Sequence, residues 1–215
     1  MKTIDLVRTL ERYVAKNGTL VVGVCGHAGA GKSTLCREFI YLASIPTIRL
    51  NCDLFSTHGY RERQELIAVA RATGDRNQID AIENPRDWYA YNAIASAISD
   101  LKQTGRHSYK RAWNSETGDL DGTYDVSLPN QRPAIILCDG IYLLHPPIRQ
   151  ALDITIIVDT ATDILDQRCI ARSKGDIERA QQHRTMRERF AVPYFDQYGW
   201  LADIVIDDKA ETSNL

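Results

Sequence analysis

The residues best suited to chemistry form a glycine-rich stretch at 26–33, which reads GHAGAGKS and matches the pattern GxxxxGKS. It directly follows the apolar run 20–25 and directly precedes a helical pattern, which is the context that a phosphate-binding loop requires. Glycines let backbone N–H groups turn toward phosphate oxygens, and the helix N-terminus adds the positive end of its dipole. The alternative is a strand-to-helix turn without function. The full motif in its full context favours a nucleotide-binding site.

Two side chains of this loop have defined chemistry in such sites. Lys32 bridges the β- and γ-phosphates, and Ser33 is a ligand of Mg²⁺. From the motif alone we therefore expect a nucleoside triphosphate with Mg²⁺, and we expect His27 to act through its backbone. The predicted nucleotide contacts are Gly26, His27, Ala28, Gly29, Ala30, Gly31, Lys32, Ser33 and Thr34.

A carboxylate follows the second apolar run, 46–50, in the segment Asn51-Cys52-Asp53-Leu54-Phe55. Ligands of doubly wound sheets bind at the carboxyl ends of the strands. Asp53 is therefore a candidate base for the proton of an attacking hydroxyl, with a helix-capping or loop role as the alternative. The sequence has no NKxD string, which a GTPase would use to read guanine.

The elements that must position these residues alternate in type. Apolar β-branched runs are typical of parallel strands buried on both faces, and helical patterns lie between them, so the order βαβα predicts an α/β fold of three layers with a central parallel sheet. The predicted strands are 20–25, 46–50, 134–138, 154–158 and 204–206, and the predicted helices are 4–14, 33–43, 61–72, 87–102, 162–172 and 176–190. The first helix is expected to begin behind a Thr3 cap and to end at Asn17-Gly18.

One stretch departs from this alternation of strands and helices. Turn signals at Thr117-Gly118-Asp119 and Asp121-Gly122 lie between aromatic and β-branched residues, which predicts a β-hairpin insertion at about 107–128. The sequence has no repeats or linkers, so we expect a single domain over residues 1–215.

Composition narrows the class of partner. The net charge is −2, with basic and acidic residues interleaved, which argues against a nucleic-acid polymer or an anionic membrane as partner. The five cysteines have no CxxC or metal-ligand spacing and read as reduced, buried thiols. No stretch approaches 18 uncharged apolar residues, so we expect no membrane span and a cytosolic location.

Several motifs together resemble the uridine kinase / phosphoribulokinase family of P-loop kinases, over roughly residues 19 to 207. The family's D-x-F/Y motif appears as Asp53-Leu54-Phe55, and its strand ending in E-G appears as Cys138-Asp139-Gly140. Its closing strand "Y-A-D-V-I-I" resembles residues 201–206, LADIVI. The resemblance implies a P-loop kinase with a helical lid, here about 168–187, which transfers the γ-phosphate of ATP to a hydroxyl.

The resemblance also implies residue roles. Asp53 matches the general base and a Mg²⁺-associated carboxylate, and Asp139 matches the Walker-B-like carboxylate, with Asp in place of Glu. Arg168 and Arg172 lie where the family has its arginine-rich lid helix and would clamp the transferring phosphoryl group, although spacing alone fits a solvated basic face equally well. The lid is several residues shorter than usual, so the family's second set of arginines is reduced or replaced here, and the candidates for the missing charge are Lys174, Arg179, Arg184 and Arg187.

The acceptor site is less well matched. Glu83 occupies the position whose aspartate holds ribose hydroxyls in uridine kinases, but Ile82 replaces an aromatic residue, and an acidic side chain there also suits a helix dipole. Tyr109 matches a substrate-contacting tyrosine whose flanking proline and aspartate are lost. The predicted substrate contacts are Asp53, Phe55, Glu83, Tyr109 and Arg111. Further aromatic residues are candidates for stacking on a nucleobase or for the core, namely Trp88, Tyr89, Tyr91, Trp113 and Tyr124.

We therefore expect a small-molecule hydroxyl as acceptor, with the 5′-hydroxyl of uridine or cytidine preferred. The family also includes nicotinamide riboside kinase and bacterial pantothenate kinase, so a riboside, a pantothenate-like or a sugar alcohol is an alternative. A nucleotide-binding regulatory protein without turnover is an alternative of another class, suggested by the short lid and by Asp139. A homo-oligomer is compatible with the sequence.

Overall fold

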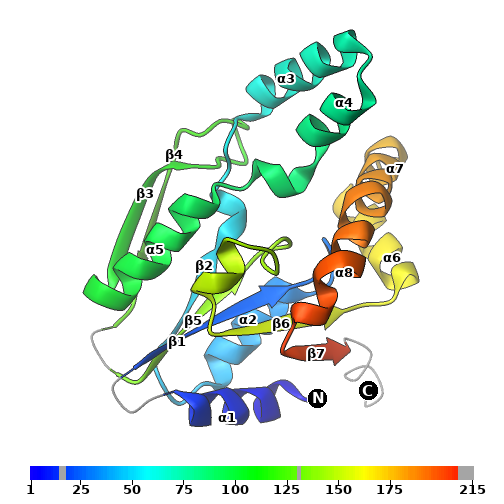
Figure 1. Ribbon diagram of the computed structural model, residues 1–215. Helices are drawn as coiled ribbons and strands as arrows, with labels where there is room; N and C mark the ends of the chain where they lie inside the picture. Colours follow the sequence, from blue (N-terminus) through cyan, green and yellow to red (C-terminus); the bar gives the residue numbers. More distant parts are fainter. Residues whose placement is uncertain (15–17, 130–131, 208–215) are drawn as a thin grey trace. The chain divides into compact units, whose positions relative to one another are not determined.

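The computed structural model describes residues 1–14, 18–129 and 132–207, and its chain forms two compact units (Figure 1). The first unit comprises Met1–Leu50 together with the chain from Leu128 onward. The second unit is Asn51–Ser127. The single domain expected from the sequence, with its lid at 168–187, stays a prediction. The predicted helix end at Asn17 lies outside the described residues.

The first unit is built on a five-stranded sheet. Its order is β2-β5-β1-β6-β7, and β1 pairs in parallel with both β5 and β6, as β6 does with β7. The strands are β1 (Thr19–Cys25), β2 (Thr47–Asn51), β5 (Ala134–Asp139), β6 (Ile154–Asp159) and β7 (Ile204–Asp207). Each corresponds to one predicted strand. The α/β class with a central parallel sheet is thereby confirmed.

Burial separates the central strands from the edges. Strands β1 and β5 are buried almost throughout, because they lie inside the sheet. In β2 only Leu50 is buried, and in β7 only Ile206. The prediction that all five strands are buried on both faces is therefore wrong for β2 and β7, which form the two edges of the sheet.

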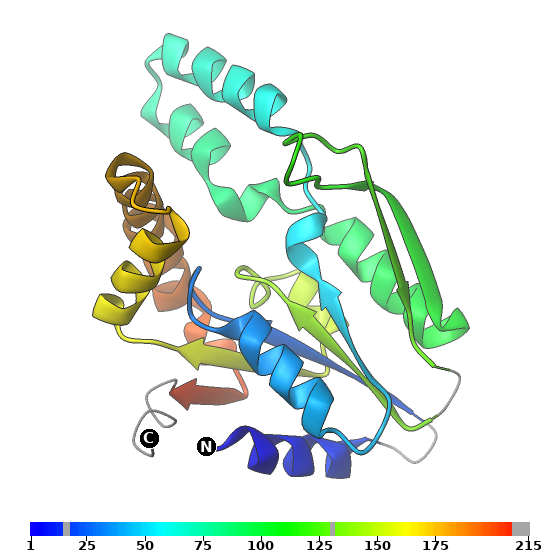
Figure 2. The ribbon, with the colours of Figure 1, turned by 180° about the vertical axis from the view of Figure 1, so that it is seen from behind.

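One face of this sheet carries a cluster of buried apolar residues. Helices α1 (Thr3–Tyr13) and α2 (Lys32–Leu42) pack side by side and bury apolar residues against alternate positions of the strands (Figures 1 and 2). The predicted Thr3 cap is wrong, since Lys2 is the N-cap residue and makes no side-chain cap. Thr3 is buried, and its hydroxyl instead donates a hydrogen bond of 2.9 Å to the Glu38 carboxylate of α2.

Three α-helices and a π-helix of the first unit follow β6, ahead of a 3-10 turn at Gly199–Leu201. They are α6 (Thr162–Arg172), α7 (Ile177–Met186), a π-helix (Arg187–Ala191) and α8 (Val192–Tyr198). The turn between α6 and α7 places Lys174 at φ 53° and Gly175 at φ 84°. Tyr194 of α8 accepts the N–H of Leu144 in the loop after β5, at 2.7 Å.

The second unit combines three helices with the predicted hairpin. Strands β3 (Arg106–Ala112) and β4 (Gly122–Ser127) pair antiparallel, and helices α3 (Tyr60–Thr73) and α5 (Tyr91–Thr104) match predicted helices. Helix α4 (Arg76–Glu83) was not predicted; its start is capped by the Asp75 side chain, which accepts from Asn77 N–H at 2.9 Å. The helix predicted from residue 87 begins later, because Pro85–Trp88 forms a separate 3-10 turn.

None of the described helices combines the length and the apolar character that crossing a bilayer needs.

Candidate functional site

The glycine-rich loop of the first unit adopts a conformation that only glycine tolerates at key positions. Gly26 has φ 145°, and a Cβ placed on it would lie 2.6 Å from the carbonyl oxygen of Val158. Gly31, at φ 94°, is the N-cap residue of α2. Thr160, directly after β6, donates from its hydroxyl to the Ala30 carbonyl at 3.0 Å. The loop is therefore held in a cradle that leads into the N-terminus of α2.

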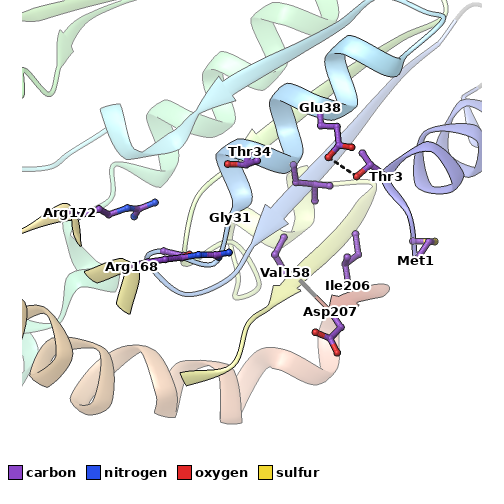
Figure 3. A pocket seen from close by; sticks show the side chains of 12 residues that line it. Met1, Thr3, Gly31, Thr34, Glu38, Val158, Arg168, Arg172, Ile206 and Asp207 are labelled. Atoms are coloured by element: carbon purple, nitrogen blue, oxygen red, sulfur yellow. Dashed lines mark hydrogen bonds between the residues drawn. The ribbon is translucent and has the colours of Figure 1, made fainter. Parts of the chain in front are cut away.

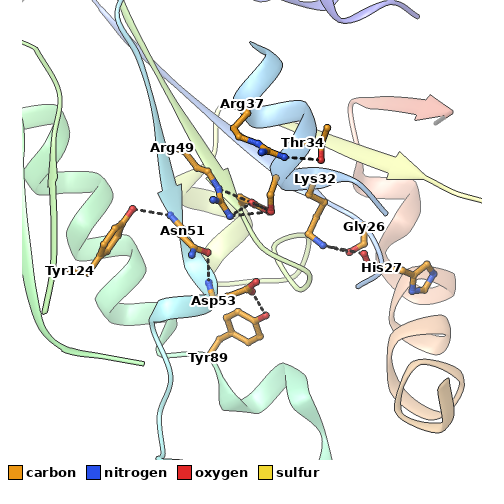
Figure 4. Close-up of polar contacts among 12 residues, drawn as sticks. Gly26, His27, Lys32, Thr34, Arg37, Arg49, Asn51, Asp53, Tyr89 and Tyr124 are labelled. Carbon is orange, nitrogen blue, oxygen red and sulfur yellow. Dashed lines mark hydrogen bonds and ion pairs between the residues drawn. The ribbon is translucent and has the colours of Figure 1, made fainter. Parts of the chain in front are cut away.

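Lys32 begins α2 and folds back over this cradle. Its Nζ donates to the carbonyl oxygens of Gly26 and His27, each at 3.1 Å, and the side chain is buried (Figure 4). His27 packs edge-on against Phe195, with ring centroids 4.7 Å apart. Burial, followed by the positive charges of Arg187 and Lys32, lowers the pKa of His27 to about 4. The imidazole is therefore neutral at pH 7 and adds no charge to the loop.

Ser33, Asp139 and Arg49 form a polar cluster next to Lys32. The Ser33 hydroxyl donates to Oδ2 of Asp139 at 2.8 Å. The guanidinium of Arg49 contacts the same carboxylate oxygen at 2.5 Å and also donates to Ser33 Oγ at 3.1 Å. Asp139 is 1% exposed, and its Oδ1 has no hydrogen-bond partner among the described residues.

This cluster fits a magnesium ion. A hydroxyl and a carboxylate with an unsatisfied buried oxygen are the hard oxygen ligands that Mg²⁺ prefers, and a buried polar atom without a partner calls for an explanation. Ser33 and Asp139 could hold the ion directly. Arg49 contributes positive charge at the same carboxylate, so it would compete with the metal.

We expect Arg49→Gln to lower the free energy of unfolding by about 2–3 kcal/mol in the absence of metal, because Asp139 loses its buried counter-charge. The loss stays below that of a fully buried pair, since the Arg49 side chain is 30% exposed. Mg²⁺ should then raise the melting temperature of the variant more than that of the wild type. Thermal unfolding with and without Mg²⁺ measures both effects, and the exposed Arg8→Gln serves as control. An equal Mg²⁺ effect on variant and wild type would contradict the assignment.

The two arginines of α6 lie beside the phosphate loop. Arg168 donates from its guanidinium to the Gly29 carbonyl at 3.0 Å, and Arg172 reaches within 4.0 Å of the position that a Cβ on Gly29 would take (Figure 3). Among the four basic residues considered for the short lid, Arg187 is buried, pairs with Asp166 at 2.5 Å and acts electrostatically on His27. Which of the four supplies the missing lid charge stays a prediction.

A pocket of about 210 Å³ opens next to this loop. Apolar side chains of the sheet and of α2 meet two carboxylates and the two arginines of α6 there (Figure 3). Such a mixture suits a nucleobase and its ribose. The sequence analysis did not select most of these residues, because nothing in their local pattern marks them. The pocket is lined by Met1, Thr3, Gly29, Gly31, Thr34, Leu35, Glu38, Val158, Arg168, Arg172, Ile206 and Asp207.

In the second unit, Asp53 lies in the 3-10 turn Cys52–Leu54 and is exposed. The Asn51 side chain caps this turn by accepting the Asp53 N–H at 3.3 Å, and the Asn51 N–H in turn donates to the Tyr124 hydroxyl at 3.1 Å. The Tyr89 hydroxyl donates to Oδ1 of Asp53 at 2.6 Å (Figure 4). Asp53 is thus accessible, with its backbone held by Asn51 and its carboxylate held by Tyr89, which is compatible with a general base.

Three aromatic residues near this turn pack against one another. Phe55 is fully buried and stacks on Tyr109, with ring centroids 4.5 Å apart, while Tyr124 meets it edge-on at 6.0 Å. Phe55 therefore supports Tyr109, and the structure gives it no open surface for a substrate. Arg111 is exposed on β3, and its charge acts on Glu62.

Glu83 has a structural partner. It is 4% exposed at the end of α4, and its Oε1 accepts from Nε and Nη2 of Arg71 on α3, at 2.7 and 2.6 Å. This pair connects α3 and α4. The sequence did not reveal it, because helix α4 was not predicted. The assignment of Glu83 to ribose hydroxyls stays a prediction, and the ion pair offers a competing role.

The family model of the "Phosphoribulokinase / Uridine kinase family" matches residues 21–198 of the chain. Uridine-cytidine kinases A and C of Dictyostelium discoideum are 26% and 24% identical to it over 190 and 157 residues. These matches cover 83% and 71% of the chain but 33% and 30% of the relatives, so the chain spans about a third of their length. A uridine kinase of Clostridium perfringens is 26% identical over 176 residues, which are 78% of the chain and 72% of that protein.

Solved structures share the fold. A putative fructose transport system kinase from Silicibacter sp. TM1040 has a TM-score of 0.68 at 17% identity, covering 96% of this chain and 99% of its own. A possible uridine kinase from Bacillus stearothermophilus has a TM-score of 0.62 at 18% identity, covering 95% and 97%. At such identities the likeness concerns the fold alone.

Proposed function

Since the chain belongs to the phosphoribulokinase / uridine kinase family, we propose that it transfers the γ-phosphate of ATP to a hydroxyl of a small molecule. The observation that carries the proposal is the Ser33–Asp139 contact of 2.8 Å beside the glycine cradle, with a buried carboxylate oxygen left for a metal ion. This arrangement suits a nucleoside triphosphate bound with Mg²⁺. A regulatory protein that only binds nucleotide would have no need of the base candidate Asp53.

Each residue has a defined task in this proposal. Lys32 would exchange its contacts with the loop carbonyls for phosphate oxygens, and Arg168 and Arg172 would hold the equatorial oxygens of the transferred group. Ser33 and Asp139 would hold Mg²⁺, which when bound neutralises charge on the β- and γ-phosphates, and Asp53 is a further candidate ligand. Asp53 would accept the proton of the acceptor hydroxyl. Such a site acts by positioning and electrostatics, with little covalent chemistry by the protein.

For the acceptor we infer a pyrimidine ribonucleoside, phosphorylated at its 5′-hydroxyl. The relatives named uridine kinase support this choice, as does the aromatic support behind Tyr109. A cytosolic location and a possible homo-oligomer stay predictions. The same chemistry on a sugar, a riboside or a pantothenate-like alcohol is the alternative acceptor class.

ADP release with a panel of nucleosides, sugars and pantothenate tests the proposal. We expect uridine or cytidine to be preferred, and their 2′-deoxy forms to be at least about tenfold poorer, because a site that hydrogen-bonds a hydroxyl rejects the analogue that lacks it. Turnover of a non-nucleoside alone would retain the kinase but overturn the acceptor. Nucleotide binding without transfer to any acceptor would instead favour the regulatory alternative.

Two matched variants decide the role of Glu83 in the same assay. If its carboxylate binds the ribose, Glu83→Gln shrinks the ribo-over-deoxy preference, whereas Arg71→Met leaves that preference intact. If Glu83 serves only to pair with Arg71, both variants lower the melting temperature to a similar extent and neither changes the preference.

A further inference from the structure

The Asp53 carboxylate contacts Tyr89 in the second unit, a residue whose sequence pattern suggested only a core or stacking role. The Tyr89 hydroxyl donates to Oδ1 of Asp53 at 2.6 Å, which is short for a hydrogen bond between oxygens (Figure 4). The two residues are 36 positions apart. Tyr89 follows the 3-10 turn Pro85–Trp88, and Asp53 lies in the 3-10 turn Cys52–Leu54. The contact therefore depends on how the chain pairs these two segments.

Main-chain hydrogen bonds hold these two segments together. Tyr89 forms a β-bridge with Ser56. The bridge is flanked on one side by the Thr57 N–H donating to the Trp88 carbonyl at 2.8 Å, and on the other by the Ala90 N–H donating to the Phe55 carbonyl at 2.9 Å. Two backbone hydrogen bonds thus hold the segment that carries Tyr89 against the segment that follows Asp53.

An arginine joins the same two segments through its side chain. The Arg63 guanidinium stacks over the Trp88 ring, 4.1 Å from the centroid, and donates to Ser56 Oγ at 2.9 Å. The Tyr89 ring also stacks on Tyr91, with centroids 5.9 Å apart and an angle of 20° between the planes. Since backbone and ring are both held, the Tyr89 hydroxyl is directed at Asp53 before any substrate binds.

We propose that Tyr89 is a positioning residue, which fixes one oxygen of the Asp53 carboxylate and so presents the other to the acceptor hydroxyl. This inference rests on the proposed kinase function. In the reaction, the acceptor O–H gives its proton to Oδ2 of Asp53 and the acceptor oxygen bonds to the γ-phosphorus. The bond from that phosphorus to the β,γ-bridging oxygen breaks, and ADP leaves. A base held in one orientation loses less rotational freedom when it reaches this geometry.

The pair Tyr89 and Tyr91 offers a matched test. Tyr89→Phe removes the hydroxyl on Asp53 but keeps the ring, and Tyr91→Phe removes a hydroxyl that donates to the Arg86 carbonyl at 2.8 Å. We expect Tyr89→Phe to lower kcat about tenfold, or ~1.4 kcal/mol of transition-state stabilisation, with KM for ATP unchanged. Tyr91→Phe should leave kcat within about twofold, because the Tyr91 hydroxyl gives its one proton to the Arg86 carbonyl, and the variant loses one ordinary hydrogen bond.

The double variant Tyr89→Phe with Asp53→Asn distinguishes a role through Asp53 from a nonspecific loss of activity. If Tyr89 acts through Asp53, adding Tyr89→Phe to Asp53→Asn lowers kcat by less than about twofold further, since residues that act as a unit are not additive. A full tenfold loss in both backgrounds overturns the proposal, as does an equal loss in Tyr91→Phe.

The ¹³C chemical shift of the Asp53 carboxylate provides a readout without turnover. It should change in Tyr89→Phe but not in Tyr91→Phe. A wild type that turns over no acceptor overturns the kinase function, whereas an active wild type with an unaffected Tyr89→Phe variant overturns only the role of Tyr89.

Discussion

Lys32→Ala is expected to reduce phosphoryl transfer by at least about 10²-fold while the chain stays folded, because the variant loses a preorganised cation that meets charge on the phosphates. The Lys32 Nζ donates to the carbonyl oxygens of Gly26 and His27, so the hydrogen bonds that the variant loses there lie within the loop itself. ADP release measures the activity, and circular dichroism with a thermal melt measures the fold.

The matched control is Lys102→Ala, which removes an exposed lysine near the end of α5. It should leave transfer unchanged. A Lys32→Ala variant that keeps near-native kcat would show that the glycine-rich loop does not bind the transferred phosphate. A variant that unfolds would be replaced by Lys32→Met, which retains the apolar stem of the side chain.

Asp53→Asn is expected to leave the affinity for ATP within a few-fold but to lower kcat by about 10²-fold or more, the usual scale for a general acid–base group. Asparagine preserves the shape and can still accept the Tyr89 hydroxyl hydrogen bond, but it cannot take up the acceptor proton. Steady-state kinetics with both substrates varied gives kcat and the two KM values separately.

Asp125→Asn, at an exposed position of β4, is the control for loss of one carboxylate in the same unit. If Asp53→Asn instead raises KM for ATP steeply and barely moves kcat, Asp53 is a nucleotide or metal group. Asp139 would then be the first candidate for the base.

Helices that are set by local signals were predicted accurately, whereas those that depend on contacts between distant segments were not. Helices α2 and α6 were predicted to within a residue at each end, because apolar periodicity and flanking glycines act over a few positions. Helix α4 was missed, since its only strong signal is the Asp75 cap and its outer face is exposed. The later start of α5 reflects the pairing of Tyr89 with Ser56, a contact between distant segments that local propensity does not contain.

The sequence by itself determined the phosphate loop, since GxxxxGKS is contiguous and its backbone conformation at Gly26 and Gly31 admits little besides glycine. It also indicated the order of strands and helices along the chain. Only the tertiary structure decided which side chains meet. Arg49 lies 90 positions from Asp139, and Tyr89 lies 36 positions from Asp53. Contacts of this kind depend on how strands are ordered in the sheet and how segments pair, and neither is encoded in local spacing.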